Sequence, residues 1–195
     1  MTISAGIDEV GRGALFGPVV AAAVLVSTDQ KKVLVQSGVT DSKRLSPRQR
    51  EFLYDQILMQ VLCCRVGLAS VTEIDRHNIL QASLLAMKRA VNKLTILPAH
   101  CWVDGNQRIP MLGIPQTTVI KGDQREVAIA AASIIAKVWR DRLIVKMAER
   151  YPGYDLTANK GYGSRAHRAA LQKLGPTRQH RLSFAPCQLT LRPYS

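Results

Sequence analysis

Residues 3–27 read ISAGIDEVGRGALFGPVVAAAVLVS, and this stretch decides the class of fold. Apolar residues alternate with small or polar ones over residues 3–8, which predicts a strand that carries Asp8 to its polar side. Residues 18–27 are almost entirely apolar and predict a second strand. The glycine-rich residues 11–17 connect the two. The chain is therefore predicted to begin by building a sheet.

Further strands and helices follow along the chain. Ser46, Pro47 and Gln49 supply an N-cap, an N1 proline and a capping-box glutamine, which predicts a helix from there to about Gln60. Periodicity and chain breakers predict strands over residues 61–70, 101–103 and 117–120, and helices over residues 78–94, 124–150 and 164–174. Strands first, with helices interleaved later, predict an α/β fold around one mixed sheet.

Length and composition indicate a single globular domain. The chain has 195 residues, 47% of them hydrophobic, which is enough for one core and excludes a disordered chain. No apolar run reaches the roughly 18–20 residues that span a bilayer, and the N-terminus has no signal-peptide pattern. The four cysteines form no CxxC pair, and Cys63 and Cys64 would point to opposite faces of a strand. We therefore expect a cytoplasmic protein with buried structural thiols.

The net charge of +13 is concentrated in the second half of the chain. Residues 1–100 contain 12 Lys and Arg against 8 Asp and Glu, whereas residues 101–195 contain 15 against 6. No acid follows Asp155, and the basic residues beyond it are Lys160, Arg165, Arg168, Lys173, Arg178, Arg181 and Arg192. Such a segment suits a polyphosphate partner, although a basic protein of another function has the same composition.

Acidic residues stand at the ends of three predicted strands. Asp8 and Glu9 end the first strand, Asp104 ends a later one, and Asp123 follows another. Burying unpartnered carboxylates is costly, but a cluster of them is tolerated when Mg²⁺ or Mn²⁺, which prefer oxygen ligands, lies between them. The pattern predicts a divalent-cation site at one edge of the sheet.

Two of these acids also have structural interpretations. Asp123 with Glu126 fits a capping box for the following helix equally well. Asp104 precedes a glycine and fits a simple turn. The adjacent acids of the first strand serve no packing purpose, so that pair alone favours a functional site when each position is taken singly.

Other kinds of site are disfavoured by their context. The glycines of residues 11–17 are followed by a strand rather than a helix, which excludes a dinucleotide-binding loop. They are expected to let the backbone approach a ligand, with Arg12 available for phosphate contact. The histidines are dispersed and none lies near a GxSxG serine, which argues against a covalent hydrolase. His167 and His180 are expected at the surface or at a substrate contact.

The segment Asp8-Glu9-Val10-Gly11-Arg12-Gly13 resembles the opening signature of the ribonuclease HII family. Further blocks follow in the family's order, from Gly6 to about Pro186. They are Gly17–Ala23, Asp41–Leu45, Val103–Gly105, Lys121–Asp123, Ala132–Val138 with Arg140-Asp141, Lys160–Gly163 and His180–Phe184. Together these blocks are far more specific than any one of them.

The resemblance implies a ribonuclease H fold, an α/β mixed sheet flanked by helices with a small helical C-terminal part. Residues 1–195 would form one catalytic domain, in which residues 151–195 are a basic helical extension. The resemblance also implies that the active site binds Mg²⁺ or Mn²⁺, two ions per site. The acids that match the family's catalytic and metal-binding positions are Asp8, Glu9, Asp104 and Asp123.

The resemblance also implies substrate-binding residues. The tripeptide Gly11-Arg12-Gly13 matches the one that senses the RNA–DNA junction through its backbone. Tyr162 matches the tyrosine that packs beside the nucleotide after the ribonucleotide and reads the 2′-hydroxyl together with that tripeptide. Lys43 and the helix from Ser133 to Arg140 resemble phosphate-contacting or site-supporting positions.

The implied activity is hydrolysis of the RNA strand of RNA–DNA hybrids and cleavage 5′ to ribonucleotides embedded in duplex DNA, as DNA replication and repair require. It would leave 5′-phosphate and 3′-hydroxyl ends. Nucleic acid is the expected partner, no membrane is involved, and we expect a monomer. Residues 188–195 contain no clear sliding-clamp-binding motif. The alternatives are a non-catalytic hybrid-binding protein and a two-metal nuclease of another family.

Overall fold

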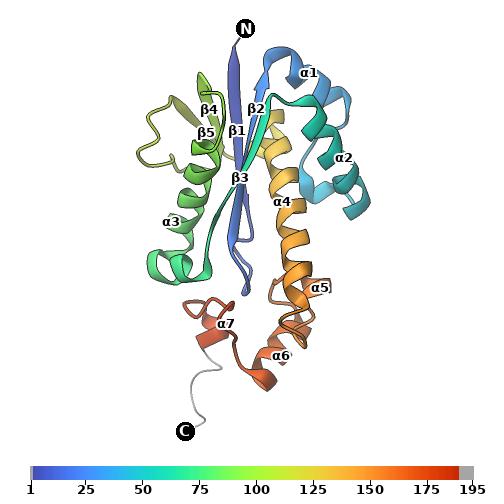
Figure 1. Cartoon of the computed structure of the whole chain (residues 1–195), viewed down its shortest axis with the longest axis vertical. Coiled ribbons are helices and arrows are strands. Elements are labelled where there is room, and N and C mark those ends of the chain that lie inside the picture. The colour runs from blue at the N-terminus through green and yellow to red at the C-terminus, as the bar shows by residue number, and fades with distance from the viewer. Residues whose placement is uncertain (1, 189–195) are drawn as a thin grey trace.

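The computed structural model describes residues 2–188, and these contain a five-stranded sheet in the order β3-β2-β1-β4-β5 (Figure 1). The strands are β1 (Ile3–Val10), β2 (Val19–Ser27), β3 (Cys63–Ala69), β4 (His100–Asp104) and β5 (Gln116–Val119). The helices are α1 (Thr28–Gln36), α2 (Pro47–Gln60), α3 (Val71–Asn92), α4 (Val127–Ala148), α5 (Leu156–Asn159), α6 (Arg165–Leu174) and α7 (Ala185–Gln188). Two short 3₁₀ helices are η1 (Ser42–Arg44) and η2 (Gly122–Gln124).

The sheet is mixed, as the sequence predicts. β2 runs antiparallel to both β1 and β3, whereas β4 is parallel to β1 and β5 is parallel to β4. The parallel register pairs Ile7 with Val103 and Val103 with Thr118, so the C-terminal ends of these three strands lie at one edge. Ligands of α/β proteins bind at this edge. The topology therefore brings together the acids that end β1 and β4.

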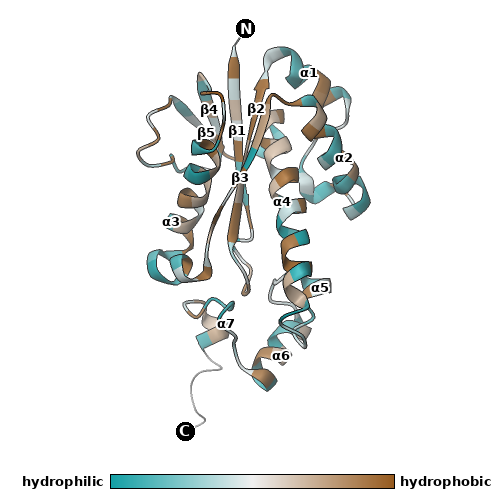
Figure 2. Ribbon diagram, viewed as in Figure 1, coloured by the Kyte–Doolittle hydropathy of each residue, from teal (hydrophilic) through white to brown (hydrophobic). Residues whose placement is uncertain are grey.

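Helices cover both faces of the sheet (Figure 1). α3 packs on one face in an aliphatic cluster that contains Leu25 and Cys63. α4 covers the other face, with α1 and α2 beside it, in a cluster that contains Val24 and packs against Cys64. Figure 2 shows hydrophobic residues along the central strands and α4. The two adjacent cysteines point to opposite faces, which confirms that prediction.

The side of β1 that carries Asp8 is buried under α4, which corrects the expectation of a polar side. Ser4 and Asp8 are both buried there. A Cβ on Gly6 would lie 2.1 Å from the backbone carbonyl carbon of Ala128. The alternation in β1 therefore reflects a requirement for small residues at these positions, because α4 packs directly on the strand.

Gly6→Ala is expected to destabilise the fold by about 1–3 kcal/mol, because the new methyl group must displace backbone rather than a flexible side chain. Urea unfolding followed by circular dichroism measures the change. Gly13→Ala is the matched control, since a Cβ there meets no heavy atom within 4 Å. A Gly6→Ala protein as stable as the control would contradict the close packing of β1 and α4.

Two N-cap signals define helices near the start of the chain. α2 spans Pro47–Gln60 with both hydrogen bonds of its capping box in place, as predicted. The periodicity does not predict α1, although Ser27 and Gln30 form the same box: the Gln30 N–H donates to Ser27 Oγ, and the Ser27 N–H donates to Gln30 Oε1. The capping pattern is the signal that could have found this helix.

α3 begins at Val71, seven residues before the predicted start. Ser70 caps it, and the backbone then departs from helical geometry at Asn78, where φ is 68° and ψ is 165°. The Asn78 side chain accepts the N–H of Gln81, so the second part of the helix has its own cap. The predicted start at Asn78 is the start of this second part, and the first part, from Val71, is not predicted.

Beyond α4, the helices α5, α6 and α7 form a small helical part at the end of the molecule farthest from the N-terminus (Figure 1). Its apolar cluster includes Leu15, Phe16, Tyr154 and Leu171, so the loop after β1 contributes to it. α6 matches the helix predicted over residues 164–174, and α7, which is not predicted, follows it. Within residues 2–188, no helix is long and apolar enough to cross a membrane.

Candidate active site

A cavity of about 380 Å³ opens at the edge of the sheet where β1 and β4 end. Nine residues predicted from the sequence line it: Asp8, Glu9, Gly11, Arg12, Gly13, Lys43, Asp104, Ser133 and Tyr162. Asp123 and Arg140 do not line it. Val10, Ser42 and Arg50 line it and were not predicted as site residues, and Lys137 lines it from the helix segment predicted over residues 133–140. Four of the lining residues are Lys or Arg, so this cavity combines carboxylates with basic side chains.

Each carboxylate at this edge has a hydrogen-bond partner within the chain. Asp8 Oδ1 accepts the N–H of Glu9 at 2.7 Å, and Glu9 Oε1 accepts from Arg12 Nη1 at 3.2 Å. Asp104 Oδ1 accepts the N–H of Gly122 at 2.7 Å. This last bond ties the turn before α4 to the end of β4.

Asp123 lies in η2 and is buried, with its Oδ2 accepting from Lys43 Nζ at 3.2 Å. It does not cap α4. Glu126 is the N-cap, since its own Oε1 accepts the Ala128 N–H at 3.2 Å, and the helix begins at Val127. The capping-box interpretation of Asp123 is therefore wrong, and the long helix starts three residues later than predicted.

Burial and neighbouring acids raise the pKa values of two carboxyl groups at this edge, those of Asp8 and Glu9. Burial, followed by repulsion from Glu9 and Asp104, raises the pKa of Asp8 well above its usual value, although a hydrogen bond from Ser133 opposes the shift. Burial also raises the pKa of Glu9, against the lowering effect of the nearby Arg12 guanidinium. Carboxylates that resist ionisation in this way are stabilised by any added positive charge.

The donor set suits a hard divalent cation, which takes carboxylate oxygens as ligands. Among residues 2–188, however, no three His, Cys, Asp or Glu side chains are arranged so that they could hold one metal ion directly. In this arrangement Lys43 pairs with Asp123, and Arg12 pairs with Glu9, each at 3.2 Å.

Lys43 is presented by η1, which a local network holds beside α4. Asp41 caps η1 by accepting the Lys43 N–H at 2.9 Å, and it also accepts from Gln124 at 3.2 Å. Ser42 Oγ lies 2.9 Å from Ser133 Oγ on α4. The Lys43 side chain remains 81% exposed, so it can move from Asp123 to a phosphate without loss of packing.

The loop after β1 meets the segment around Tyr162 across the cavity. Ala14 and Tyr162 form an isolated antiparallel bridge, and the Leu15 N–H donates to the Gly161 carbonyl at 2.8 Å. Lys137 Nζ lies 5.5 Å from the centroid of the Tyr162 ring. The structure thus places the tripeptide and the tyrosine at one cavity, as the resemblance implies.

Arg140 is not a phosphate-contacting residue. It is fully buried and donates to the backbone carbonyls of Phe16, Pro18 and Lys160. The family resemblance allowed two roles for Arg140, contact with a phosphate or support of the site. Because its side chain is fully buried, the structure favours support of the site.

His167 and His180 are also fully buried, which corrects their expected surface position. His180 Nδ1 accepts the Thr177 N–H at 2.9 Å, so its proton is on Nε2, which donates to His167 Nε2 at 3.0 Å. His167 Nδ1 then donates to the Tyr162 carbonyl at 2.9 Å. Burial lowers the pKa of His180 to about 4, consistent with two neutral rings. These histidines hold the tyrosine segment in place.

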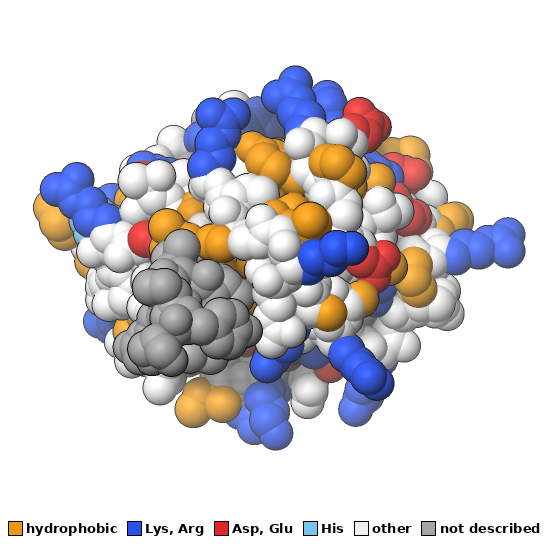
Figure 3. All heavy atoms as spheres, turned by 90° about the horizontal axis from the view of Figure 1, so that it is seen from below, with side chains coloured by type: hydrophobic (Ala, Val, Ile, Leu, Met, Phe, Trp, Pro, Cys, Tyr) orange, Lys and Arg blue, Asp and Glu red, His pale blue; other side chains and the backbone are white. Residues whose placement is uncertain are grey.

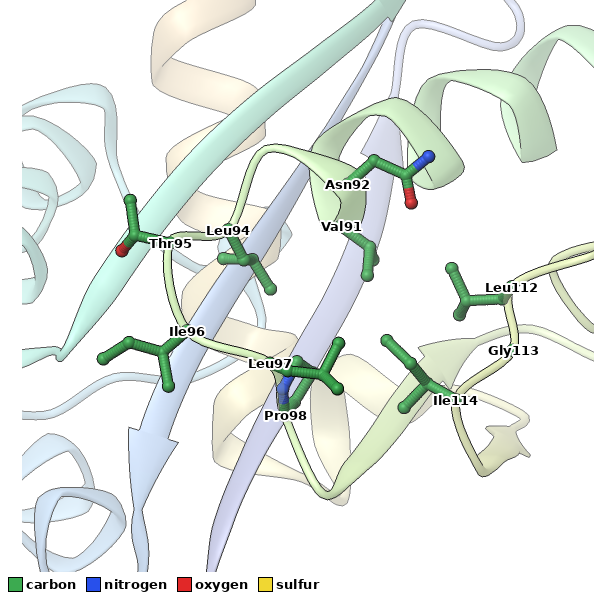
Figure 4. A pocket seen from close by; sticks show the side chains of 10 residues that line it. All are labelled: Val91, Asn92, Leu94, Thr95, Ile96, Leu97, Pro98, Leu112, Gly113 and Ile114. Carbon is green, nitrogen blue, oxygen red and sulfur yellow. The ribbon is translucent and has the colours of Figure 1, made fainter.

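A second cavity, of about 440 Å³, lies at the C-terminal end of α3 (Figure 4). Its lining is mostly aliphatic and includes Val91, Leu94, Leu97 and Ile114, with no acidic, basic or histidine side chain. This lining offers no carboxylate or imidazole for acid–base chemistry, whereas the carboxylate cavity at the ends of β1 and β4 has both acidic and basic side chains.

The strand order, the flanking helices and the acids at the ends of β1 and β4 define an α/β enzyme of the ribonuclease H fold. Among solved structures, the chain resembles ribonuclease H2 from Pyrococcus horikoshii, with a TM-score of 0.86, 27% identity and 97% of each chain covered. It also resembles ribonuclease HII in its complex with PCNA from Archaeoglobus fulgidus, with a TM-score of 0.74 and 30% identity over 87% of this chain and 85% of that one.

The chain belongs to the ribonuclease HII family, whose model matches residues 5–187. It is 67% identical to ribonuclease HII of Acaryochloris marina over 97% of this chain and 96% of that protein. It is 58% identical to ribonuclease HII of Trichodesmium erythraeum over 97% and 90%. The chain is thus a ribonuclease H, an endonuclease that acts on RNA–DNA hybrids. Family membership excludes the two alternatives, a nuclease of another family and a non-catalytic binding protein.

Proposed function

We propose that this enzyme cuts the phosphodiester bond 5′ to a ribonucleotide, in long hybrids and in duplex DNA that contains a single ribonucleotide, and leaves 5′-phosphate and 3′-hydroxyl ends. Asp8, Glu9, Asp104 and Asp123 would hold two divalent cations, Mg²⁺ or Mn²⁺. The observation that carries this proposal is the group of acids at the ends of β1 and β4, the buried Asp8 and the half-buried Glu9 and Asp104, in a cavity that Lys and Arg side chains also line. Removal of embedded ribonucleotides would place the enzyme in DNA repair.

The acids and the basic side chains have separate tasks in this mechanism. Bound divalent ions would activate the attacking water and stabilise the leaving oxygen. Lys43 and Arg12 exchange their contacts with Asp123 and Glu9 for contacts with phosphate oxygens as substrate enters. This exchange would free Glu9 and Asp123 to hold the divalent ions, so substrate binding and assembly of the site would be coupled.

Recognition of the ribonucleotide rests on the residues of the cavity that are not acids, Arg12, Gly13 and Tyr162. Arg12 and Gly13 are exposed, and no acceptor within residues 2–188 bonds their backbone N–H groups. Tyr162 lines the same cavity as these two residues. A 2′-hydroxyl is both donor and acceptor and is the group that distinguishes RNA from DNA, so free N–H groups next to an aromatic ring suit its recognition.

The C-terminal part supplies a basic surface. Arg165, Arg168 and Lys173 are exposed on α6, and Figure 3 shows Lys and Arg side chains around this end of the molecule. We propose that residues 151–188 are an extension of one catalytic domain that holds the duplex by its phosphates. A clamp-binding motif is not part of the proposal, because residues 189–195, where the sequence has no clear one, lie outside the described residues.

Replacing Arg165, Arg168 and Lys173 together with Ala is expected to weaken binding of any hybrid and to flatten its salt dependence. Each lost phosphate contact lowers the slope of log K against log[salt] by roughly 0.9, so the slope falls by up to about 3. Fluorescence anisotropy over a salt series measures this. The bond that is cut should not change, since phosphate contacts carry no sequence information. A shifted cleavage site would show that these residues read the substrate.

The test of the proposed function is cleavage of duplex DNA that contains one ribonucleotide. With Mg²⁺ or Mn²⁺ we expect a single cut 5′ to the ribonucleotide and a 3′-hydroxyl end that a DNA polymerase can extend. EDTA should stop the reaction, and zinc should replace Mg²⁺ poorly, because the site offers only oxygen ligands. Cleavage on the 3′ side, or activity in EDTA, would contradict the mechanism.

A further inference from the structure

Two arginines, Arg140 on α4 and Arg181 after α6, are fully buried beneath the loop that follows β1. Neither makes an ion pair with any acid among residues 2–188. Burial, together with repulsion from Arg140, lowers the pKa of Arg181 to about 9. Burying two neighbouring charges without a counter-charge is costly. The hydrogen bonds of the two guanidinium groups show which part of the fold they stabilise.

Five backbone carbonyls accept from these two guanidinium groups. Arg140 donates to Phe16, Pro18 and Lys160, at 2.9, 3.1 and 2.9 Å. Arg181 donates from Nε to the Gly17 carbonyl at 3.0 Å and from Nη1 to the Arg12 carbonyl at 2.8 Å. Four of the five carbonyls belong to residues 12–18, so the two side chains together turn the carbonyls of this loop inward.

The bond from Arg181 to Arg12 orients one peptide group in the cavity. The Arg12 carbonyl and the Gly13 N–H belong to the same planar trans peptide and point in opposite directions. With the carbonyl held inward, the Gly13 N–H points away from the protein interior. A Cβ on Gly13 would meet no heavy atom within 4 Å, so the space on that side is open to a ligand.

Arg140 connects the same loop to the tyrosine segment. Its guanidinium donates a hydrogen bond to the Lys160 carbonyl, and its Cζ lies 5.4 Å from the centroid of the Tyr162 ring. Gly11 lies directly on this side chain, because a Cβ there would be 2.2 Å from Arg140 Nε. The loop and the tyrosine are therefore held by one buried group.

We propose that Arg181, acting with Arg140, is a positioning residue for ribonucleotide recognition: it fixes the Arg12–Gly13 peptide so that its N–H faces the substrate. Arg181 touches no reacting atom and acts only through the loop. This inference rests on the proposed function, since it assumes that residues 11–13 read the ribonucleotide. Lysine cannot replace arginine here, because one ammonium group lacks the fork that reaches two carbonyls.

The experiment compares wild type, Arg181→Lys and the control Arg178→Lys on two substrates, a duplex with one ribonucleotide and a uniform RNA–DNA hybrid. Arg178 is exposed and contacts Tyr151 rather than the loop. For Arg181→Lys we expect kcat/KM on the single-ribonucleotide duplex to fall at least tenfold more than on the uniform hybrid. The control should keep the wild-type ratio. Thermal unfolding shows whether each variant is folded.

An equal loss on both substrates, or no loss, would overturn the proposal, since a merely structural role lowers both rates together. If Arg181→Lys shows no cooperative unfolding, Phe184→Leu replaces it, because the Phe184 ring lies 5.2 Å from the Arg181 guanidinium and restrains it. That variant should lower the ratio about threefold, and an unchanged ratio would overturn the proposal. Failure of wild type to cut the single-ribonucleotide duplex would instead contradict the proposed function.

Discussion

Asp8→Asn is expected to abolish cleavage of an RNA–DNA hybrid while hybrid binding remains. The side chain is nearly unchanged in shape, but a neutral amide is a poorer ligand for a divalent cation than a carboxylate. We expect the rate to fall more than about a thousandfold, on the order of 4 kcal/mol in the barrier. Binding should persist, because Lys and Arg supply most of the affinity for phosphates.

The same substitution should leave the fold as stable as wild type or more so. Burial and two neighbouring acids raise the pKa of Asp8, so the ionised side chain is disfavoured in the folded protein and a neutral one removes that repulsion. A variant that is more stable and inactive is the expected signature of a residue kept for chemistry rather than for folding. Loss of stability together with activity would point to a structural role.

Cleavage rate with Mg²⁺, hybrid affinity in EDTA and urea unfolding are the three measurements. Asp29→Asn is the matched control, because Asp29 is an exposed acid on α1 whose contact with Lys32 is at the surface. It should match wild type in all three. Full activity of purified Asp8→Asn would remove Asp8 from the proposed metal ligands.

Much of the fold can be predicted from local patterns. Alternation in β1, the apolar run of β2 and the capping box at Ser46 each act within a few residues, so they give the sheet and α2 their correct places. The start of α3 was missed because the apolar spacing that reveals a helix is clear only after Asn78, where the backbone breaks. Sequence patterns that span a few residues predict that a helix or strand is present more reliably than they predict where it begins and ends.

The site divides in the same way. The acids at strand ends follow from position along each strand, and parallel pairing explains why Asp8 and Asp104 meet at one edge. Arg140, Arg181 and His180 could not be placed from the sequence, because a basic residue in a basic segment has the same pattern whether it is buried or exposed. Their burial depends on the loop after β1, which is more than 120 residues away along the chain from Arg140.

Substitutions of Tyr162 separate recognition from catalysis and should give the second-largest effect. Tyr162→Phe keeps the ring and loses one hydrogen bond, so a loss of roughly 1 kcal/mol, under about tenfold in rate, is expected. Tyr162→Ala also removes the stacking surface and should cost on the order of 1–3 kcal/mol more. Both losses should be largest on a duplex with one ribonucleotide, where the junction is the only feature to read.

The control for Tyr162 is Tyr54→Phe, since Tyr54 lies on α2 outside the carboxylate cavity and packs under Arg142. Rates on the single-ribonucleotide duplex at fixed salt and metal give the comparison, and thermal unfolding confirms that the Ala variant is folded. Because the Tyr162 carbonyl is held by His167 and its N–H by the Asn159 carbonyl, the backbone segment keeps its anchors when the ring is removed. A slow Ala variant would then report the ring itself. If the Ala variant cleaves as fast as wild type, the ring takes no part in recognition, and reading of the ribonucleotide must rest on residues 11–13 alone.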